Sequence, residues 1–206
     1  VKVKINGAEY EVAKNATILE AARSAGIHIP TLCYLKDINA IGSCRICVVE
    51  VKGAKSLVAS CVYPVSEGME IVTNSAKVQH SRRMTLELIL SDHNQACLTC
   101  ARNQNCELQR LSVEYGMREI RFEHDKNHEY PDIEDSAVHL VRDNNKCILC
   151  RRCVAVCKAN QGVSVIGPSR RGFKTRITCA FDAELKDVPC INCGQCIAVC
   201  PTGALT

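Results

Sequence analysis

Cysteine is the residue type that dominates the chemistry available to this chain. Sixteen of its 206 residues are cysteines, several times the usual share, so a disulfide framework and metal ligation are the two explanations to weigh. A disulfide framework needs an oxidising compartment. The N-terminus is an alternating strand and not an apolar export signal, and no run of about 20 apolar residues exists. We therefore expect a reduced, cytoplasmic protein without a membrane span, whose cysteines bind metal.

The most specific pattern is an internal repeat near the C-terminus. The run CILCRRCVAVCK, which begins at Cys147, matches the run CINCGQCIAVCP, which begins at Cys190, in cysteines and in apolar positions; this indicates duplication. Three thiolates in a Cys-x2-Cys-x2-Cys loop can hold three irons of a cubane, and the cysteine four residues later reaches a neighbouring cluster. Two 4Fe–4S clusters are thus predicted, one held by Cys147, Cys150, Cys153 and Cys200 and the other by Cys157, Cys190, Cys193 and Cys196. The alternative, two zinc sites, leaves the third cysteine of each run unexplained.

A different kind of cluster is predicted near the N-terminus. Four cysteines lie there, Cys33, Cys44, Cys47 and Cys61. A plant-type 2Fe–2S ferredoxin has the spacing Cys-x4-Cys-x2-Cys and a distant fourth ligand. Here the first interval is ten residues, which rules out a simple plant-type ferredoxin. Gly42 opens the loop before Cys44 and lets the backbone approach a cluster, so we predict a 2Fe–2S site.

The third set has only three cysteines, Cys97, Cys100 and Cys106, and alone they could hold a 3Fe–4S cluster or a zinc ion. His93 precedes them at the end of a predicted helix, where its imidazole would complete a 4Fe–4S site and alter its potential. The other candidate histidines, His80, His124, His128 and His139, have no such context. Cys179 remains without a cluster, and we expect it to be a small buried packing residue.

The elements that must position these ligands follow from hydrophobic periodicity and turn signals. A hairpin is predicted around Asn6-Gly7, and hairpin, helix and returning strands together favour a β-grasp domain. The predicted elements are strands at 1–5, 9–13, 46–51, 56–60 and 173–178, and helices at 17–25, 76–92 and 107–115. We expect an α+β protein with a β-grasp 2Fe–2S domain at 1–76, a small helical 4Fe–4S domain at 77–117, a connecting segment at 118–137 and a two-cluster ferredoxin domain at 138–206.

Charge and composition weigh against nucleic acid as a partner. The formal net charge is +4, but aromatic residues make up only 4% and there is no tryptophan. Lysines and arginines form no long run. Four bound clusters would shift the charge by roughly −7, to roughly −3, because thiolates outweigh the iron charge.

The order of these sites resembles a known family. It comprises a 2Fe–2S domain with the ten-residue interval, then His93-Asn-Gln-Ala-Cys97-Leu-Thr-Cys100, and last a two-cluster ferredoxin ending Cys200-Pro-Thr-Gly-Ala-Leu. This resembles the accessory N-terminal region of multi-cluster [FeFe]-hydrogenases, especially the NAD(P)-linked and electron-bifurcating ones. The same beginning is shared with the large iron–sulfur subunit of NADH:quinone oxidoreductase and with NAD-dependent formate dehydrogenase.

The resemblance implies electron transfer through one 2Fe–2S and three 4Fe–4S clusters. The expected partners are an NAD(P)H- and flavin-binding iron–sulfur subunit or a ferredoxin on one side, and a hydrogenase catalytic domain or subunit on the other. The Thr-Ser-Cys-Cys-Pro and Met-Pro-Cys motifs of that catalytic domain are missing, as are nucleotide-binding fingerprints. We therefore predict no catalytic residue here, and expect either a truncated hydrogenase or a stand-alone subunit of a larger complex.

Overall fold

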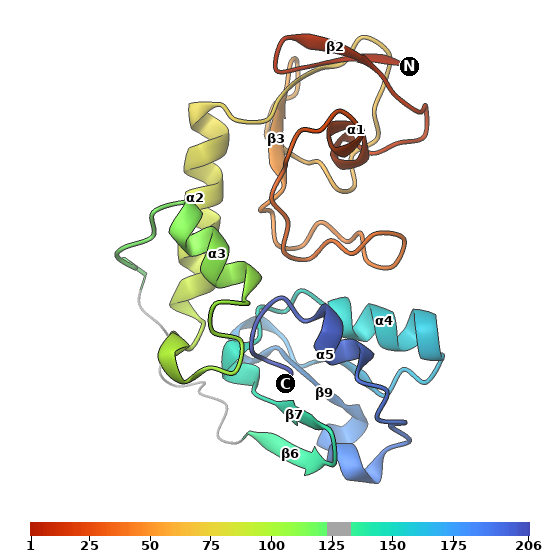
Figure 1. Ribbon diagram of the computed structural model, residues 1–206, viewed down its shortest axis with the longest axis vertical. Coiled ribbons are helices and arrows are strands. Elements are labelled where there is room, and N and C mark those ends of the chain that lie inside the picture. The colour runs from red at the N-terminus through yellow and green to blue at the C-terminus, as the bar shows by residue number, and fades with distance from the viewer. Residues whose placement is uncertain (123–132) are drawn as a thin grey trace. The chain divides into compact units, whose positions relative to one another are not determined.

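The computed structural model describes residues 1–122 and 133–206, which divide into two compact units (Figure 1). The first unit consists of Val1–Tyr34 and Ala40–Leu86, and the second of Leu35–Asn39 and Glu87–Thr206. The boundary falls inside helix α2 (Ala76–Ser91). The four-part division expected from the sequence stays a prediction.

The first unit is built on a five-stranded sheet. Its elements are β1 (Lys2–Ile5), β2 (Ala8–Glu11), α1 (Ile18–Ser24), β3 (Val48–Val51), β4 (Val58–Ala59) and β5 (Glu70–Val72). The strand order is β2-β1-β5-β3-β4. β1 pairs with β5 in parallel, and every other pair in this sheet is antiparallel. A hairpin followed by a helix and a last strand parallel to the first is the β-grasp order that the sequence predicts.

Local sequence explains the first two connections of this unit. Asn6 and Gly7 have φ of 52° and 89°, the pair of positive values that a two-residue hairpin turn requires, and Asn-Gly adopts it readily. Thr17 then caps α1, because its side chain accepts a hydrogen bond from the Glu20 amide while the Glu20 carboxylate accepts one from the Thr17 amide. This reciprocal capping box starts the helix one residue later than predicted.

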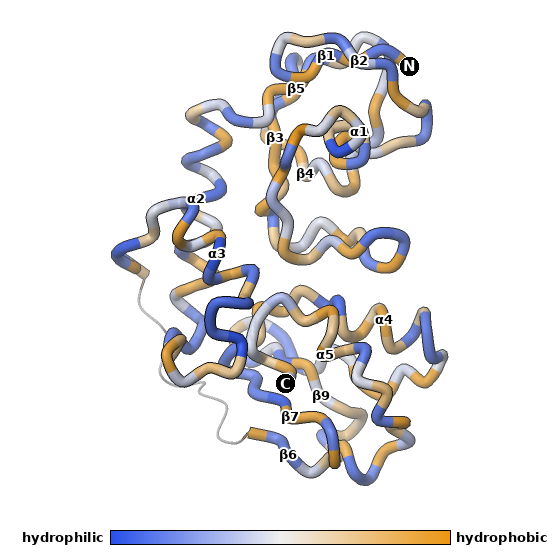
Figure 2. Tube along the Cα trace, in the orientation of Figure 1, coloured by the Kyte–Doolittle hydropathy of each residue, from blue (hydrophilic) through white to orange (hydrophobic). Residues whose placement is uncertain are grey.

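The core of the first unit lies between α1 and the sheet. Ile18 and Leu19 of α1 are fully buried and pack in one cluster with Ile5, Val49 and Ile71 from three strands. β3 is drawn largely in orange in Figure 2, which reflects its apolar sequence Val-Val-Glu-Val. β5 was not predicted, because only one of its three residues is buried and so short a strand shows no alternation.

The second unit combines three helices with two small antiparallel sheets. Its helices and strands are α3 (Glu107–Glu114), β6 (Glu134–Ala137), β7 (Leu140–Arg142), α4 (Arg152–Gln161), β8 (Ile166–Ser169), β9 (Arg176–Cys179) and α5 (Gln195–Val199), and its 3-10 segments are η1 (Cys97–Thr99), η3 (Asn144–Lys146), η4 (Gly172–Lys174), η5 (Ala180–Asp182) and η6 (Leu185–Asp187). β6 pairs with β7 and β8 pairs with β9. Leu140, Ile166, Ile177 and Leu185 form the centre of its apolar core.

Two expectations for this unit need correction or lie outside the description. Part of the connecting segment expected at 118–137, including His124 and His128, falls in residues 123–132, outside the described residues. Its last four residues, however, form strand β6. The strand predicted at 173–178 begins later, at Arg176, because Gly172 with φ of 62° starts a 3-10 turn.

The C-terminal residues are held along β7. Thr206 exchanges backbone hydrogen bonds with Val141 at 2.8 and 3.1 Å, and the Asp143 amide donates to the Ala204 carbonyl at 2.9 Å. This pairing fixes the chain that follows the last cysteine. No helix within the described ranges is long and apolar enough to cross a membrane.

Candidate iron–sulfur sites

The first unit brings the four N-terminal cysteines together. Cys33, Cys47 and Cys61 are at most 1% exposed, and Cys44 is half-buried. Cys33 lies within hydrogen-bonding reach of Cys44 and Cys61, and Cys47 within reach of Cys61. Four sulfur atoms in such mutual contact are the donor set that a 2Fe–2S cluster needs.

Proton sharing divides these four thiols into two kinds. Hydrogen bonds from Cys44 and Cys61 hold the pKa of Cys33 far below its usual range, and a hydrogen bond from Cys61 lowers the pKa of Cys47 to about 6. The same contacts raise the pKa values of Cys44 and Cys61. Two thiolates are therefore already favoured, and iron would displace the remaining protons.

The loop that carries Cys44 and Cys47 has the backbone shape predicted from Gly42. Gly42 and Arg45 have φ of 62° and 58°. A Cβ at position 42 would lie 3.3 Å from a methyl carbon of Val62, so glycine also gives the loop room to pack. Ser60 anchors the loop from the other side, because its hydroxyl donates to the Cys47 carbonyl at 2.7 Å.

The second unit contains two cavities that are each lined by four cysteines. One cavity, with about 400 Å³ of empty volume, is lined by Cys147, Cys150, Cys153 and Cys200. The other, with about 520 Å³, is lined by Cys157, Cys190, Cys193 and Cys196. In each cavity three cysteines come from one run of the repeat and the fourth from the other run. This is the exchange expected from the sequence, and ligation itself stays a prediction.

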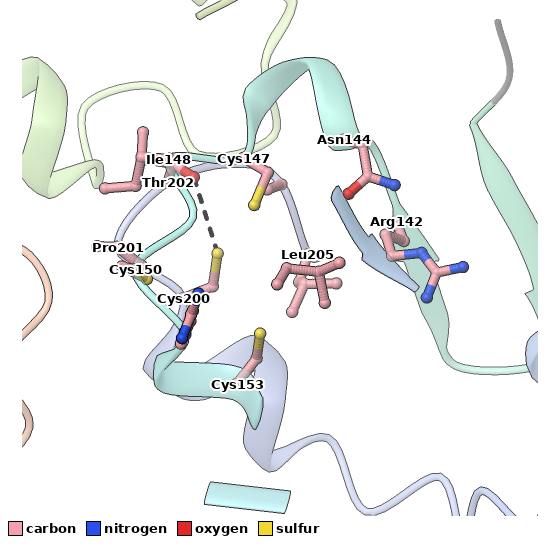
Figure 3. Close-up of a pocket in the computed structure, with 13 residues that line it drawn as sticks. Arg142, Asn144, Cys147, Ile148, Cys150, Cys153, Cys200, Pro201, Thr202 and Leu205 are labelled. Atoms are coloured by element: carbon pink, nitrogen blue, oxygen red, sulfur yellow. Dashed lines mark hydrogen bonds between the residues drawn. The ribbon is translucent and has the colours of Figure 1, made fainter. Parts of the chain in front are cut away.

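Figure 3 shows how the first of these cavities is formed. The sulfur atoms of Cys147, Cys153 and Cys200 face a common space, which Leu205 closes on another side. The dashed line joins the Cys200 sulfur to the hydroxyl of Thr202 at 3.8 Å. Fully buried Thr202 also donates to the Lys146 carbonyl at 2.8 Å, which ties the chain after Cys200 to the chain before Cys147.

The sequence repeat is also a repeat of backbone conformation. Leu149 and Arg151 have φ of 54° and 60°, and their equivalents Asn192 and Gly194 have φ of 52° and 70°. Positive φ at a leucine or an arginine is uncommon and strained. It turns backbone amides toward the cysteines, as in the contact of the Leu149 amide with the Cys147 sulfur at 3.4 Å. Helices α4 and α5 begin directly after these loops.

Burial makes the thiols of these two cavities poor acids until iron arrives. It raises the pKa of Cys147 to about 12 and that of Cys196 to about 11, and the pKa of Cys153 is also raised. A buried thiolate needs a nearby positive charge, which the iron of a cluster supplies when bound. The donor set therefore fits a cluster and does not fit a set of free thiolates.

The histidine-containing set lies between α2 and α3. His93 follows the end of α2, Cys97 begins η1, and Cys106 caps α3 by accepting from the Gln109 amide at 3.5 Å. Burial lowers the pKa of His93 to about 4, with the Lys146 ammonium acting in the same direction. The imidazole is thus neutral at pH 7, as a metal ligand must be.

One ring nitrogen of His93 fits a metal-binding role. Its Nδ1 is buried and has no hydrogen-bond partner among the described residues. A buried nitrogen without a partner is costly unless it binds something. In the described ranges, no group of three or more His, Cys, Asp or Glu side chains is arranged to hold a single metal ion, so the fit of this set rests on its donor chemistry and on Nδ1.

Cys179 lies apart from all four sets, at the end of β9. It is 2% exposed and belongs to the apolar core of the second unit, as expected for a packing residue. Its one unpredicted feature is the Arg142 guanidinium, whose Nη1 lies 3.9 Å from the sulfur. Burial raises the pKa of this thiol, so it stays protonated.

Two residues near the Cys147 cavity could not be found from the sequence. Asn39, in the interval between Cys33 and Cys44, belongs to the second unit and donates its side-chain amide to the Cys150 carbonyl at 3.1 Å. Arg102 donates to the Cys200 carbonyl at 2.8 Å. Both contacts join segments far apart in sequence, and no local pattern marks them.

Three segments of the chain match families of known domains. Residues 1–76 match a 2Fe-2S iron-sulfur cluster binding domain, residues 82–121 the NADH-ubiquinone oxidoreductase-G iron-sulfur binding region, and residues 146–204 a 4Fe-4S dicluster domain. The protein is therefore a mixed α/β chain of 2Fe–2S and 4Fe–4S ferredoxin-type domains, as the sequence predicts.

Whole-chain comparisons point to hydrogenase subunits. The chain is 44% identical over 208 residues to the NADP-reducing hydrogenase subunit HndD of Solidesulfovibrio fructosivorans, and the match covers 98% of this chain and 35% of HndD. It is 31% identical over 207 residues to the gamma subunit of the NAD-reducing hydrogenase HoxS of Cupriavidus necator, and that match covers 100% of this chain and 86% of the HoxS protein. The chain spans 24% to 35% of the length of the first curated relatives that it matches.

A solved structure agrees with these relatives. A chain in the crystal structure of an NAD+-reducing [NiFe]-hydrogenase in the H2-reduced state superimposes with a TM-score of 0.90 at 32% identity, and the match covers 100% of this chain and 86% of that one. The resemblance stated from the cysteine pattern is confirmed at this level. The chain belongs to the family of iron–sulfur domains shared by NADH-quinone oxidoreductase G and the NAD-reducing hydrogenases.

Proposed function

We propose that this chain conducts electrons through one 2Fe–2S and three 4Fe–4S clusters. The 2Fe–2S cluster is held by Cys33, Cys44, Cys47 and Cys61; the histidine-ligated 4Fe–4S cluster by His93, Cys97, Cys100 and Cys106; and the remaining two by the cysteine sets that line the two cavities. The observation that carries the proposal is the sorting of eight cysteines into two cavities of four. A chain that used these cysteines for another purpose would have no need to exchange them between the runs.

The residues of this chain hold and tune the clusters, and bound iron supplies the redox chemistry. Buried thiols keep water from the iron, backbone amides at positive-φ loop positions approach sulfur, and the neutral His93 ring replaces one thiolate. One charge less at that cluster changes its potential relative to the three all-cysteine clusters. A graded set of potentials is what a relay needs.

The composition of the isolated chain tests the cluster count. Anaerobic purification followed by iron and sulfide analysis should give about fourteen irons per chain, and EPR at stepwise potentials should resolve four signals. A content near four irons, or a colourless zinc-containing sample, would refute the relay.

We infer that the relay links an NAD(P)H- and flavin-binding subunit, or a ferredoxin, to a hydrogenase catalytic domain. The support is that the relatives with full-length matches include hydrogenase subunits with NADP or NAD in their names. The sequence pattern favours an [FeFe] catalytic partner, whereas the superimposed crystal structure is of a [NiFe] enzyme. Metal analysis of the complex purified through this chain distinguishes them, because nickel is present only in the second.

The alternative is the corresponding part of a formate dehydrogenase or an NADH:quinone oxidoreductase. It is favoured by a full-length match, at 36% identity, to NADH-quinone oxidoreductase G 2 of Rhizobium meliloti. The same purified complex should be assayed with hydrogen, formate and NADH in turn. Hydrogen-dependent reduction of the clusters supports the hydrogenase assignment, and reduction by formate or NADH but not by hydrogen supports the alternative.

A further inference from the structure

The segment that ends the second cysteine run also forms a wall of the histidine-containing set. The Cys200 carbonyl accepts from Arg102 at 2.8 Å, and the Pro201 carbonyl accepts from the Glu107 amide at 2.9 Å. The same Pro201 carbonyl lies 3.6 Å from the Cys106 sulfur. Residues that the sequence assigns to the ferredoxin domain therefore contact the neighbouring site on several atoms.

Gly203 makes the closest of these approaches. A Cβ built on Gly203 would lie closer to the Cys100 sulfur than real Cβ atoms ever approach another atom. Its other neighbours, the Cδ of Lys146 at 3.6 Å and the Cβ of Arg102 at 3.7 Å, are ordinary van der Waals contacts. Gly203 is buried and its φ does not lie in the left-handed region, so the backbone itself would accept alanine. The Cys100 sulfur is the obstacle.

The backbone at Gly203 has little freedom to move away. Thr202 on one side is fully buried and donates to the Lys146 carbonyl at 2.8 Å, as Figure 3 shows for the position of its hydroxyl beside Cys200. Ala204 on the other side accepts from the Asp143 amide at 2.9 Å. A clash at position 203 must therefore be relieved by Cys100.

A free thiol and an iron-bound sulfur respond differently to such a clash. A free cysteine can rotate about χ1 to another staggered position at small cost. A sulfur bonded to a cluster is fixed by that bond and by the other ligands. An added methyl group at 203 should therefore disturb the cluster-bound state far more than the folding of the metal-free chain.

We propose that Gly203 is a positioning residue for the cluster held by His93, Cys97, Cys100 and Cys106: it leaves the space that the Cys100 sulfur occupies when bound to iron. The proposal rests on the ligand set of the proposed function. It gives the glycine of the Cys-Pro-Thr-Gly ending a role at a cluster to which that ending supplies no ligand.

Gly203→Ala tests this in the intact chain, purified anaerobically. The expected result is loss of the EPR signal of the histidine-ligated cluster and of about four of about fourteen irons, with the 2Fe–2S signal and the other two 4Fe–4S signals retained. Gly167→Ala is the matched control, because Gly167 also lacks a positive φ and a Cβ there meets nothing within 4 Å. It should keep the iron content and all four signals. Gly203→Ala with an unchanged histidine-ligated signal overturns the inference.

A double-mutant comparison separates this role from a general effect on folding. In a Cys100→Ala background the obstructing sulfur is gone, so adding Gly203→Ala should change neither the remaining iron content nor the unfolding midpoint. A further loss in that background shows that Gly203 acts elsewhere and also overturns the inference. If the unaltered chain itself lacks the histidine-ligated signal, it is the proposed function that fails, before any variant is compared.

Discussion

The side-chain amide of Asn39 donates a hydrogen bond to the backbone carbonyl of Cys150, 111 positions away in the sequence, at 3.1 Å. Asn39 is 4% exposed. It ends a small loop closed by paired backbone hydrogen bonds with Leu35, each 2.8 Å long. The ten-residue interval between Cys33 and Cys44, unusual for a 2Fe–2S ferredoxin, therefore supplies a contact to a different cysteine loop.

Asn39→Ala should weaken the loop that carries Cys150. Loss of the donor leaves a buried carbonyl unpaired, which costs about 1–3 kcal/mol of unfolding free energy. Loss of a positive dipole near the cluster should also lower its potential, by roughly 20–40 mV if the difference between its two oxidation states is below about 1 kcal/mol. An EPR-monitored redox titration measures the shift. Exposed Asn15→Ala serves as control, and equal shifts in both variants would contradict the assignment.

Thr202 should be needed for its hydroxyl and not for its shape. Thr202→Val keeps the volume but leaves the Lys146 carbonyl without its 2.8 Å donor, so we expect a loss of about 1–3 kcal/mol in unfolding free energy. Thr202→Ser retains the hydroxyl and should lose less. Chemical denaturation of the cluster-loaded chain, followed by visible absorbance, compares the two; similar losses in both would argue for a packing role.

The ion pair between Glu107 and Arg152 should fasten the start of α3 to the start of α4. Arg152 donates to both carboxylate oxygens, at 2.6 and 2.9 Å, and its side chain is 7% exposed, whereas that of Glu107 is 39% exposed. Glu107→Ala leaves a mostly buried guanidinium without its partner, and we expect a loss of about 1–2 kcal/mol after allowing for solvent screening.

The matched control for that pair is Glu114→Ala. Its exposed contact with Arg110 spans 3.7 Å, and such pairs contribute about 0.3–0.5 kcal/mol. Urea unfolding of both variants measures the difference. Comparable losses would mean that the buried position of Arg152 confers no advantage.

Exchange of the fourth ligand between the two cysteine runs can be tested by pairing substitutions. Cys157→Ser and Cys193→Ser should abolish or alter the same EPR signal, because both cysteines line the same cavity. Cys200→Ser and Cys150→Ser should affect the other signal. If Cys157→Ser instead altered the signal that Cys150→Ser removes, each run would ligate its own cluster.

Cys179→Ala is the cysteine substitution that should leave all clusters in place. The residue packs in the apolar core and lines neither of the two four-cysteine cavities. Iron content should remain at about fourteen per chain, and the unfolding free energy should fall by about 1 kcal/mol for the lost buried sulfur. A drop in iron content would show that one of the assigned ligands has been misidentified.

The ligand sets and the N-terminal elements could be predicted because they are local. The three-cysteine loops, the Asn6-Gly7 turn and the start of α1 at Thr17 each depend on residues within a few positions of one another, so spacing and turn chemistry suffice. The strands of the second unit could not be predicted in the same way. β6 and β7 are short, only partly apolar, and stabilised by pairing with each other and with the C-terminal residues.

The sequence by itself determined the number and kind of candidate cluster sites, the family and the order of domains, because cysteine spacing and a duplicated run carry that information along the chain. Only the tertiary structure decided which distant residues support those sites. Asn39 beside Cys150, Thr202 beneath Lys146 and Gly203 against Cys100 are contacts between segments 56 to 111 positions apart. They arise from how the loops pack, and packing between remote segments leaves no periodic pattern in a single sequence.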